Sequence, residues 1–142
     1  MATVFISAEN PLFRQQPLRW NNAQMNMLLH DLRERVPDKN IKLVQFIDMK
    51  TGYSEESFKV TGVSIPDMIF LARYYKQKGF IIDGKGSLDI DTMMLNPQIK
   101  KYTGVAAYKM AKQTGGVVSF VEGGHAVTYV LDFEHPVPFK LR

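Results

Sequence analysis

The sequence predicts a single domain of the α+β class, with helices in its first half and antiparallel strands in its second. Apolar residues recur at helical spacing in two stretches before residue 79, and two runs rich in β-branched residues follow residue 116. Helices that precede strands, instead of alternating with them, are typical of α+β domains. The 142 residues suffice for one domain with a buried core. Within it we expect an irregular N-terminal arm (1–20), a mainly helical part (21–79) and a mainly β part (80–142).

The first predicted helix lies between an irregular arm and a proline. Val4–Ser7 is either a short strand or part of the arm, and two prolines keep Asn10–Trp20 irregular. The helix is expected to start near Ala23, with the two asparagines before it as caps, and to stop at Pro37. Its buried stripe contains Met25, Leu28, Leu29, Leu32 and Val36.

The second predicted helix has a clearer start signal. Before it, Ile41–Ile47 is a predicted strand, with a short helix as the alternative, and Asp48–Gly62 is a predicted loop. Ser64 can cap the helix, Asp67 completes a variant of the capping box, and Gly79 ends the helix. Its buried stripe contains Ile65, Met68, Ile69, Ala72 and Tyr75.

The elements predicted after residue 79 are shorter. Phe80–Ile82 forms a strand that leads into a turn at Asp83–Ser87, and Val105–Gln113 forms a helix. Asp91–Tyr102 is assigned to neither class, because a proline interrupts it. Two strands joined by a tight glycine-containing turn occupy Gly115–Val130, and prolines argue against a strand after residue 133.

His125, at the start of the second of these strands, is the residue that the sequence offers as a catalytic base. An imidazole held at a strand end by rigid backbone is well placed to accept a proton. The residue that it would most naturally activate is a cysteine, and the chain contains none. A turn or core histidine is the structural alternative.

Three stretches together resemble the papain-like cysteine peptidase superfamily. Trp20–Leu29 resembles the nucleophile box of ubiquitin-specific and viral papain-like proteases, with alanine at position 23 where they carry cysteine. Thr61–Ala72, with the later Lys78-Gly79-Phe80, is similar to a helix of the double-glycine leader peptidases. Gly123–Val127 is similar to the strand around the catalytic histidine, and the order of the stretches also matches.

The resemblance implies a papain-like fold and a thiol-based activity. An N-terminal helical part with the nucleophile position would pack on a C-terminal antiparallel sheet with the histidine. Ala23 would hold the nucleophile position at a helix start, which lowers the pKa of a thiol, and His125 would be the base. With cysteine at position 23 the protein would cleave or deamidate a peptide or protein substrate. Gln16, Asn21 and Asn22 are the candidate oxyanion donors, and the two asparagines also fit as helix caps.

The third catalytic residue departs from the pattern that the resemblance implies. Asp132 is the candidate acid that would orient His125, but on a regular strand the two side chains point to opposite faces. Asp132 would serve only if the strand bends or bulges. The alternatives are a catalytic dyad, orientation of the histidine by a backbone carbonyl, and loss of the third residue.

Position 23 leaves three interpretations open. The alanine replaces a catalytic cysteine by engineering, it is natural in an inactive relative, or the chain has an unrelated fold. The alternative function is a non-catalytic protein-binding module or inhibitor of viral, phage or bacterial-effector type. A small peptidase without disulfides suits a reducing cytoplasm, including a host cytoplasm after delivery.

Composition argues against several other classes of function. The net charge of +4 is mild and its cations are interspersed with acids, so nucleic-acid binding is not expected. No apolar run approaches the about 18 residues of a membrane helix, and the N-terminus lacks a secretory signal pattern. With zero cysteines and three histidines that lack ligand spacing, we expect no metal, no other cofactor and no membrane partner.

Overall fold

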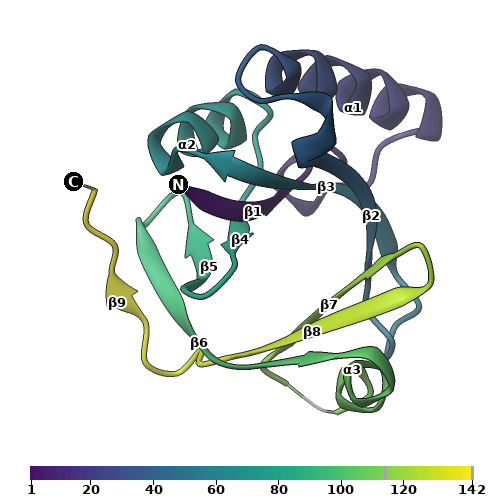
Figure 1. Ribbon diagram of the computed structural model, residues 1–142, viewed down its shortest axis with the longest axis vertical. Coiled ribbons are helices and arrows are strands. Elements are labelled where there is room, and N and C mark those ends of the chain that lie inside the picture. The colour runs from purple at the N-terminus through teal and green to yellow at the C-terminus, as the bar shows by residue number, and fades with distance from the viewer. Residues whose placement is uncertain (114, 142) are drawn as a thin grey trace.

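In its described residues, the chain folds into a closed barrel of eight antiparallel strands with three α-helices packed on the outside (Figure 1). The computed structural model describes residues 1–113 and 115–141, and of Phe13 the backbone alone. The strands are β1 (Ala2–Ile6), β2 (Ile41–Ile47), β3 (Ser54–Val63), β4 (Gly79–Ile82), β5 (Gly86–Asp89), β6 (Met94–Thr103), β7 (Val117–Glu122), β8 (His125–Leu131) and β9 (Val137–Pro138). The helices are α1 (Leu18–Arg33), α2 (Ile65–Tyr74) and α3 (Gly104–Ala111), and short 3-10 turns lie at Pro11–Phe13 and Asp38–Asn40.

The order of strands around the barrel is β5, β4, β1, β3, β2, β7, β8 and β6. Pairing of β5 with β6 closes the ring. The short strand β9 pairs with the first residues of β6. Two sets of neighbouring strands therefore make up the wall: five from the first 89 residues, and three that follow them. In Figure 1 the strands form a ring, with α1 and α2 on one side of it and α3 on the opposite side.

The alternation of side chains along the strands creates one core outside the barrel wall and another inside it. On β1, Val4 and Ile6 face outward and pack against α1 and α2, whereas Phe5 faces the interior. The stripe predicted for α1 supplies Met25, Leu28 and Leu32 to the outer core. The inner core consists of Phe5, Val44, Ile81, Phe120, Tyr129 and Leu131.

The third helix packs on the outer face of β7 and β8 through a small polar contact. The hydroxyl of Thr128, which is fully buried, donates to the carbonyl oxygen of Ala107 at 2.8 Å. The hydroxyl of Ser119 lies 2.7 Å from the same Thr128 oxygen and can donate to it. Both buried hydroxyls are therefore satisfied, and they fix α3 to the sheet.

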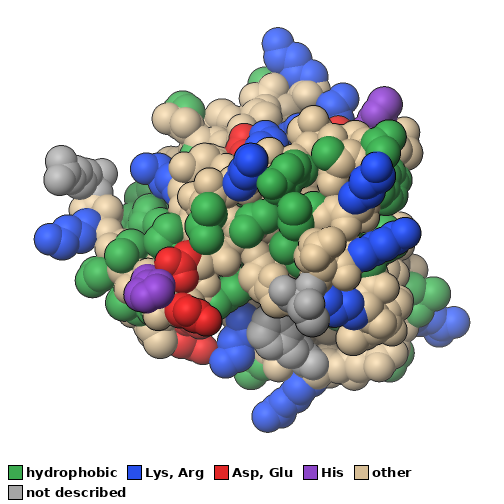
Figure 2. Space-filling view, turned by 90° about the horizontal axis from the view of Figure 1, so that it is seen from below, with side chains coloured by type: hydrophobic (Ala, Val, Ile, Leu, Met, Phe, Trp, Pro, Cys, Tyr) green, Lys and Arg blue, Asp and Glu red, His purple; other side chains and the backbone are tan. Residues whose placement is uncertain are grey.

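The side of the molecule that carries α3 is apolar at its centre and cationic around it. Figure 2 shows hydrophobic side chains in the middle of this face, lysine and arginine side chains around them, and acidic side chains at one edge. The large exposed hydrophobic residues of β6 and α3 are Ile99, Val105 and Tyr108. On this face the cationic side chains are dispersed and do not form one track. In the described part of the chain, no helix has both the length and the apolar character needed to cross a membrane.

The barrel is closed by a tight contact between β5 and β6. Gly86 pairs with Pro97, Ser87 with Asn96 and Leu88 with Leu95. Gly86 has a φ of 141°, and a Cβ at this position would lie 2.0 Å from the carbonyl oxygen of Asn96. Only glycine lets the two backbones approach this closely. We call these three residue pairs the closing seam.

The predicted α+β class and the papain-like arrangement are wrong. Strands occur in both halves of the chain and join in one barrel, and the helices lie outside it instead of forming a helical part beside a sheet. The error arises because several strands of this barrel carry polar as well as apolar side chains on their inner faces. Their sequences therefore lack the apolar runs by which strands were assigned.

Two segments show this error directly. The predicted loop Asp48–Gly62 contains most of β3, in which Phe58 and Val60 face the outer core while Lys59 between them is polar. The unassigned segment Asp91–Tyr102 contains most of β6. Pro97 is accepted there because it lies next to an irregularity of the strand between Gln98 and Lys100.

The helix predictions were better than the strand predictions. The cap of α2 is confirmed, since the Ser64 hydroxyl accepts a hydrogen bond from the Asp67 amide at 3.3 Å. The helix α3, the hairpin of β7 and β8, and β2 and β4 are also confirmed. The start of α1 was placed too late: the helix begins at Leu18, after Pro17, and not near Ala23.

Candidate ligand-binding site in the barrel

A pair of stacked aromatic rings divides the interior of the barrel. The rings of Phe5 and Phe120 are 4.2 Å apart between centroids and inclined by 15°. The ring of Tyr129 meets Phe5 edge-on at 5.7 Å. These rings belong to β1, β7 and β8, and they fill the middle of the barrel.

Two cavities lie on either side of this aromatic pair, and Phe5 and Phe120 line both. One extends toward the start of β3, where Glu55 and Ser57 line it, and measures about 600 Å³. The other extends toward the middle of β3, where Lys59 lines it, and measures about 390 Å³. We call them the Glu55 cavity and the Lys59 cavity. The interior of an eight-stranded barrel is wide enough for cavities that hold small ligands.

The Glu55 cavity combines aromatic walls with a few polar groups. Its aromatic lining includes Phe5, Phe46, Phe120 and Phe133. The side chains of Ser57, Ser87 and Asn96 also line it and make no hydrogen bond with a described residue. A cavity of this kind can bury the apolar body of a small molecule and still bind its polar atoms.

Glu55 is one of two carboxyl groups that line this cavity, the other being Asp89, and Tyr53 holds Glu55 in place. The hydroxyl of Tyr53 donates to the Glu55 carboxylate at 2.6 Å. Burial raises the pKa of the Glu55 carboxyl above its ordinary value; the bond from Tyr53 lowers it in part and the charge of Glu9 raises it. Burial and the Glu55 carboxylate also raise the pKa of Tyr53 to about 12, so that its hydroxyl stays a donor. A carboxyl with a perturbed pKa in a cavity is a typical feature of a functional site.

The loop before α1 fixes the position of Tyr53. The side-chain amide of Asn10 donates to the Tyr53 hydroxyl at 2.8 Å. Asn10 has a φ of 44°, a left-handed conformation that asparagine tolerates better than most residues. Asn21, buried on α1, accepts from the Asn10 backbone amide at 3.0 Å and donates to its side-chain oxygen at 2.9 Å. A continuous set of hydrogen bonds therefore connects the start of α1 with Glu55.

The charges around the Glu55 cavity favour a cation. Glu55, Asp89 and Lys78 are the charged residues that line it. Lys78 already pairs with Asp91, which is not among the lining residues, at 3.3 Å. The cavity therefore presents more negative than positive charge to a ligand.

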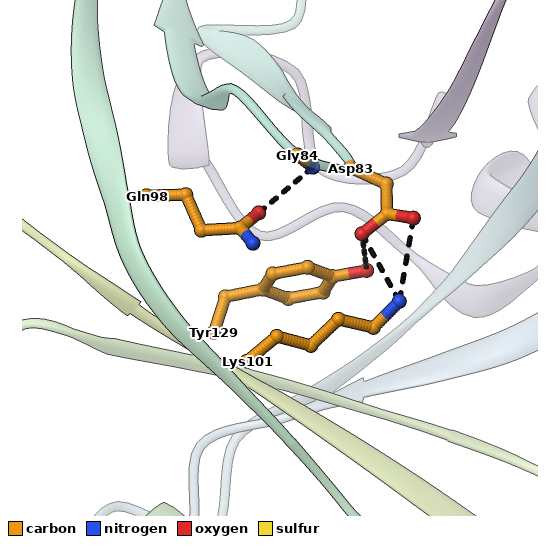
Figure 3. Close-up of polar contacts among 5 residues, drawn as sticks. All are labelled: Asp83, Gly84, Gln98, Lys101 and Tyr129. Atoms are coloured by element: carbon orange, nitrogen blue, oxygen red, sulfur yellow. Dashed lines mark hydrogen bonds and ion pairs between the residues drawn. The ribbon is translucent and has the colours of Figure 1, made fainter.

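The Lys59 cavity has a different chemical character. Its polar lining includes Lys59, Lys101, Glu122 and His125. Figure 3 shows Lys101 and Tyr129 converging on Asp83, which follows β4. The Lys101 amine lies 3.1 Å from one Asp83 oxygen, and the Tyr129 hydroxyl donates to the same oxygen at 3.1 Å. This cluster ties the turn after β4 to β6 and β8.

The structure does not bring the predicted nucleophile position and the predicted base together. Ala23 is exposed on α1, which packs on the outside of the barrel next to β1 and β3. His125 is exposed at the start of β8 and lines the Lys59 cavity, of which Ala23 is not part. In Figure 1, α1 and the hairpin of β7 and β8 lie on different sides of the ring.

The other residues predicted for that site have structural contacts. Asn21 binds Asn10 as described, and Asn22 is exposed on α1. The backbone amide of Gln16 donates to Asn10, and its side chain donates to the Arg14 carbonyl at 3.4 Å. Asp132 bonds the imidazole of His135 at 3.0 Å and accepts from the backbone amides of residues 134 and 135. These contacts shape the loop before α1 and the turn after β8.

Sequence reasoning missed Tyr53, Glu55 and Asn10. The one signal near the first two is the short alternation of Ser57 and Lys59 with Phe58 and Val60, further along the strand that contains Glu55. Such a pattern is typical of a barrel strand with a polar interior. The sequence holds no comparable local signal for Asn10.

Comparison with known proteins supplies no family for this barrel. No protein-family model, no curated protein and no solved structure matches the chain. Among the described residues, no group of three or more His, Asp or Glu side chains is placed to hold a metal ion. The resemblance to papain-like peptidases is therefore wrong as a statement of family and fold. Thiol peptidase or deamidase activity on a peptide or protein substrate stays a prediction, but the papain-like fold from which it was inferred is not the observed fold.

Proposed function

We propose that the protein is a non-catalytic binding module that holds a small organic cation with an aromatic or apolar body in the Glu55 cavity. The observation that carries this proposal is the Glu55 carboxylate, held by Tyr53 at 2.6 Å, in a cavity of about 600 Å³ with aromatic walls. The aromatic rings supply apolar area and can face a cation, while the carboxylate binds the charged nitrogen.

The polar groups along the wall define the rest of the ligand. The hydroxyls of Ser57 and Ser87 and the amide of Asn96 come from three strands and face the same cavity. They can donate to and accept from one or two further polar atoms. An arylalkylamine with a hydroxyl or carbonyl group is the class of compound that fits.

A binding assay with matched compounds and variants tests the proposal. Tryptamine and phenethylamine are titrated calorimetrically against the neutral alcohol and the carboxylic acid of the same skeleton. We expect the amines to bind and Glu55→Gln to weaken them about tenfold or more, as expected when a charge-assisted hydrogen bond is lost. Glu56→Gln is the control, because Glu56 is the next residue on β3 and does not line the cavity.

The pH dependence of amine binding gives a second readout. Since burial raises the pKa of Glu55, affinity for the amine is expected to fall as pH drops through that raised value. Equal affinity for amine and alcohol, or equal effects of Glu55→Gln and Glu56→Gln, would contradict the proposal.

A further inference from the structure

We propose that the Lys59 cavity is a second binding site, independent of the first, and that it takes a small zwitterion of the amino-acid type. The two cavities are separated by the Phe5–Phe120 pair, whose centroids are 4.2 Å apart. The volume of about 390 Å³ suits a molecule of a few heavy atoms with its water.

Lys59 supplies the positive part of this site. Its amine makes no ion pair or hydrogen bond with a described residue. The residue that pairs with Lys59 on the neighbouring strand β2 is a second lysine, Lys42. Lys101 lines the same cavity, but Asp83 compensates its charge at 3.1 Å (Figure 3). Lys59 is therefore the cation that a ligand anion would meet.

The start of α3 adds to the same positive end. Thr103 and Gly104, the cap and the first residue of α3, both line the cavity. The Thr103 side chain does not cap the helix, and the first turn of α3 contains no acidic residue. The first backbone amides of the helix stay available for a carboxylate next to Lys59.

Glu122 supplies the negative part. One oxygen of its carboxylate is buried and has no hydrogen-bond partner among the described residues. Glu122 is the last residue of β7 and lines the cavity together with Lys59. A buried carboxylate oxygen without a donor is costly, and the ammonium group of a ligand would supply one.

Lys59 and Glu122 do not neutralise each other directly. Both line one cavity, but no nitrogen–oxygen distance between them is 4.0 Å or shorter. A molecule with a carboxylate at one end and an ammonium at the other satisfies both residues at once. A simple anion would leave the Glu122 oxygen unpaired, and a simple cation would leave Lys59 unpaired.

A chain-length series of zwitterions tests this inference. Glycine, β-alanine and γ-aminobutyrate are titrated by calorimetry and by amide chemical-shift changes, with propionate and propylamine as the single-charge controls. We expect at least one zwitterion to bind about tenfold more tightly than both controls, with shift changes at Thr103, Gly104 and Glu122.

Variants distinguish this site from the Glu55 cavity. Lys59→Met and Glu122→Gln are each expected to weaken the zwitterion about tenfold, and Glu122→Gln to remove its advantage over propionate. Lys42→Met is the matched control, since Lys42 is the cross-strand partner of Lys59 but does not line the cavity. Glu55→Gln should leave zwitterion affinity unchanged. The inference is overturned if none of the three zwitterions binds saturably, or if Lys59→Met and Lys42→Met change zwitterion affinity equally. Either result is independent of whether amines bind in the Glu55 cavity.

Discussion

Among single residues, Asn10 and Asn21 determine the geometry of the Glu55 cavity although neither lines it. Asn21 exchanges two hydrogen bonds with Asn10 and donates a third to the carbonyl of Gln16 at 3.3 Å. Asn10 in turn donates to the Tyr53 hydroxyl, which binds Glu55. Removing one of these amides leaves buried partners without bonds, and the effect reaches the carboxylate through Tyr53.

Asn21→Ala is expected to lower the free energy of unfolding by about 2 kcal/mol, because several buried groups lose their partners. Asn22→Ala is the matched control, since Asn22 is exposed on the same turn of α1 and should change stability by no more than about 0.5 kcal/mol. Urea denaturation followed by circular dichroism measures both. Equal losses for the two variants would show that Asn21 acts only through helix propensity.

Glu55 makes stability depend on pH in a defined direction. Its pKa is raised in the folded chain, so the stabilising effect of the protonated carboxyl is complete below the unfolded value, near 4.5. That effect is lost as pH rises through the raised folded value. Glu55→Gln should therefore gain stability relative to the natural chain as pH rises from mild acid to neutral. Thermal unfolding at a series of pH values measures the difference, with Glu134→Gln, at an exposed position that does not line the cavity, as the control that should show no such trend.

The catalytic residues were predicted from local patterns, and local patterns do not place residues in space. Asn21 was expected either to donate to an oxyanion or to cap a helix. It does not cap α1, because the helix begins earlier and buries Asn21 against Asn10. His125 was correctly placed at the start of a strand. Its neighbours in the Lys59 cavity come from β3, β6 and β7, which no local pattern around residue 125 could indicate.

Among the elements, α3 is bound to the sheet through one buried hydroxyl, in addition to its buried alanines and the exposed bond from Tyr108 to Gly124. Thr128 bonds both the helix, at the Ala107 carbonyl, and the neighbouring strand, at Ser119. Ala107 is itself fully buried, so the helix approaches the sheet closely enough for this bond. The small side chains at this contact are what allow the approach.

Thr128→Val removes this hydroxyl while keeping the shape of the side chain. We expect a loss of about 1 to 3 kcal/mol, because the Ala107 carbonyl and the Ser119 hydroxyl both lose a buried partner. Thr61→Val on β3 is the control: its hydroxyl bonds no described residue, and the change should stay within about 0.5 kcal/mol. A similar loss in both variants would contradict the role given to Thr128. Chemical denaturation measures each.

Elements were predicted correctly where one face is apolar and the other polar. They were missed where polar side chains also occur on the face that points into the barrel. The stripe of α2 and its Ser64 cap were found because a surface helix needs one apolar face and a start signal. In β3, however, Glu55 and Lys59 line the interior cavities, and such polar residues leave the segment, predicted as a loop, without the apolar run of a strand. Strand β5 was missed for another reason: four residues beside a turn are too few for any period to show.

At the scale of the whole molecule, the closing seam decides whether the sheet is a barrel or an open sheet. It consists of three residue pairs between β5 and β6, and Gly86 lies at its tightest point. The fold class could not be predicted from the sequence because ring closure depends on strand pairings, not on the pattern within any strand. Gly86 was seen only as part of a turn.

Gly86→Ala is expected to cost about 3 kcal/mol or more, because its Cβ would meet the Asn96 carbonyl oxygen and the backbone would keep an unfavourable φ. Gly84→Ala is the matched control: it carries a positive φ of 84° but its Cβ would meet nothing within 4 Å. This control should lose only about 1 kcal/mol. Thermal unfolding compares the two, and equal losses would show that the seam accepts a side chain.

The junction of β2 with β7 has a consequence for synthesis of the chain. In the part of the chain that the structure describes, three residue pairs form it: Gln45 with Val121, Phe46 with Phe120 and Ile47 with Ser119. While the ribosome makes the chain, β2 can pair with β3 long before β7 exists, and its other edge stays open. An open strand edge is a template for pairing with another chain. The nascent protein therefore has its greatest tendency to associate wrongly between the emergence of β3 and that of β7, and a slow translation pause in that interval would prolong the risk.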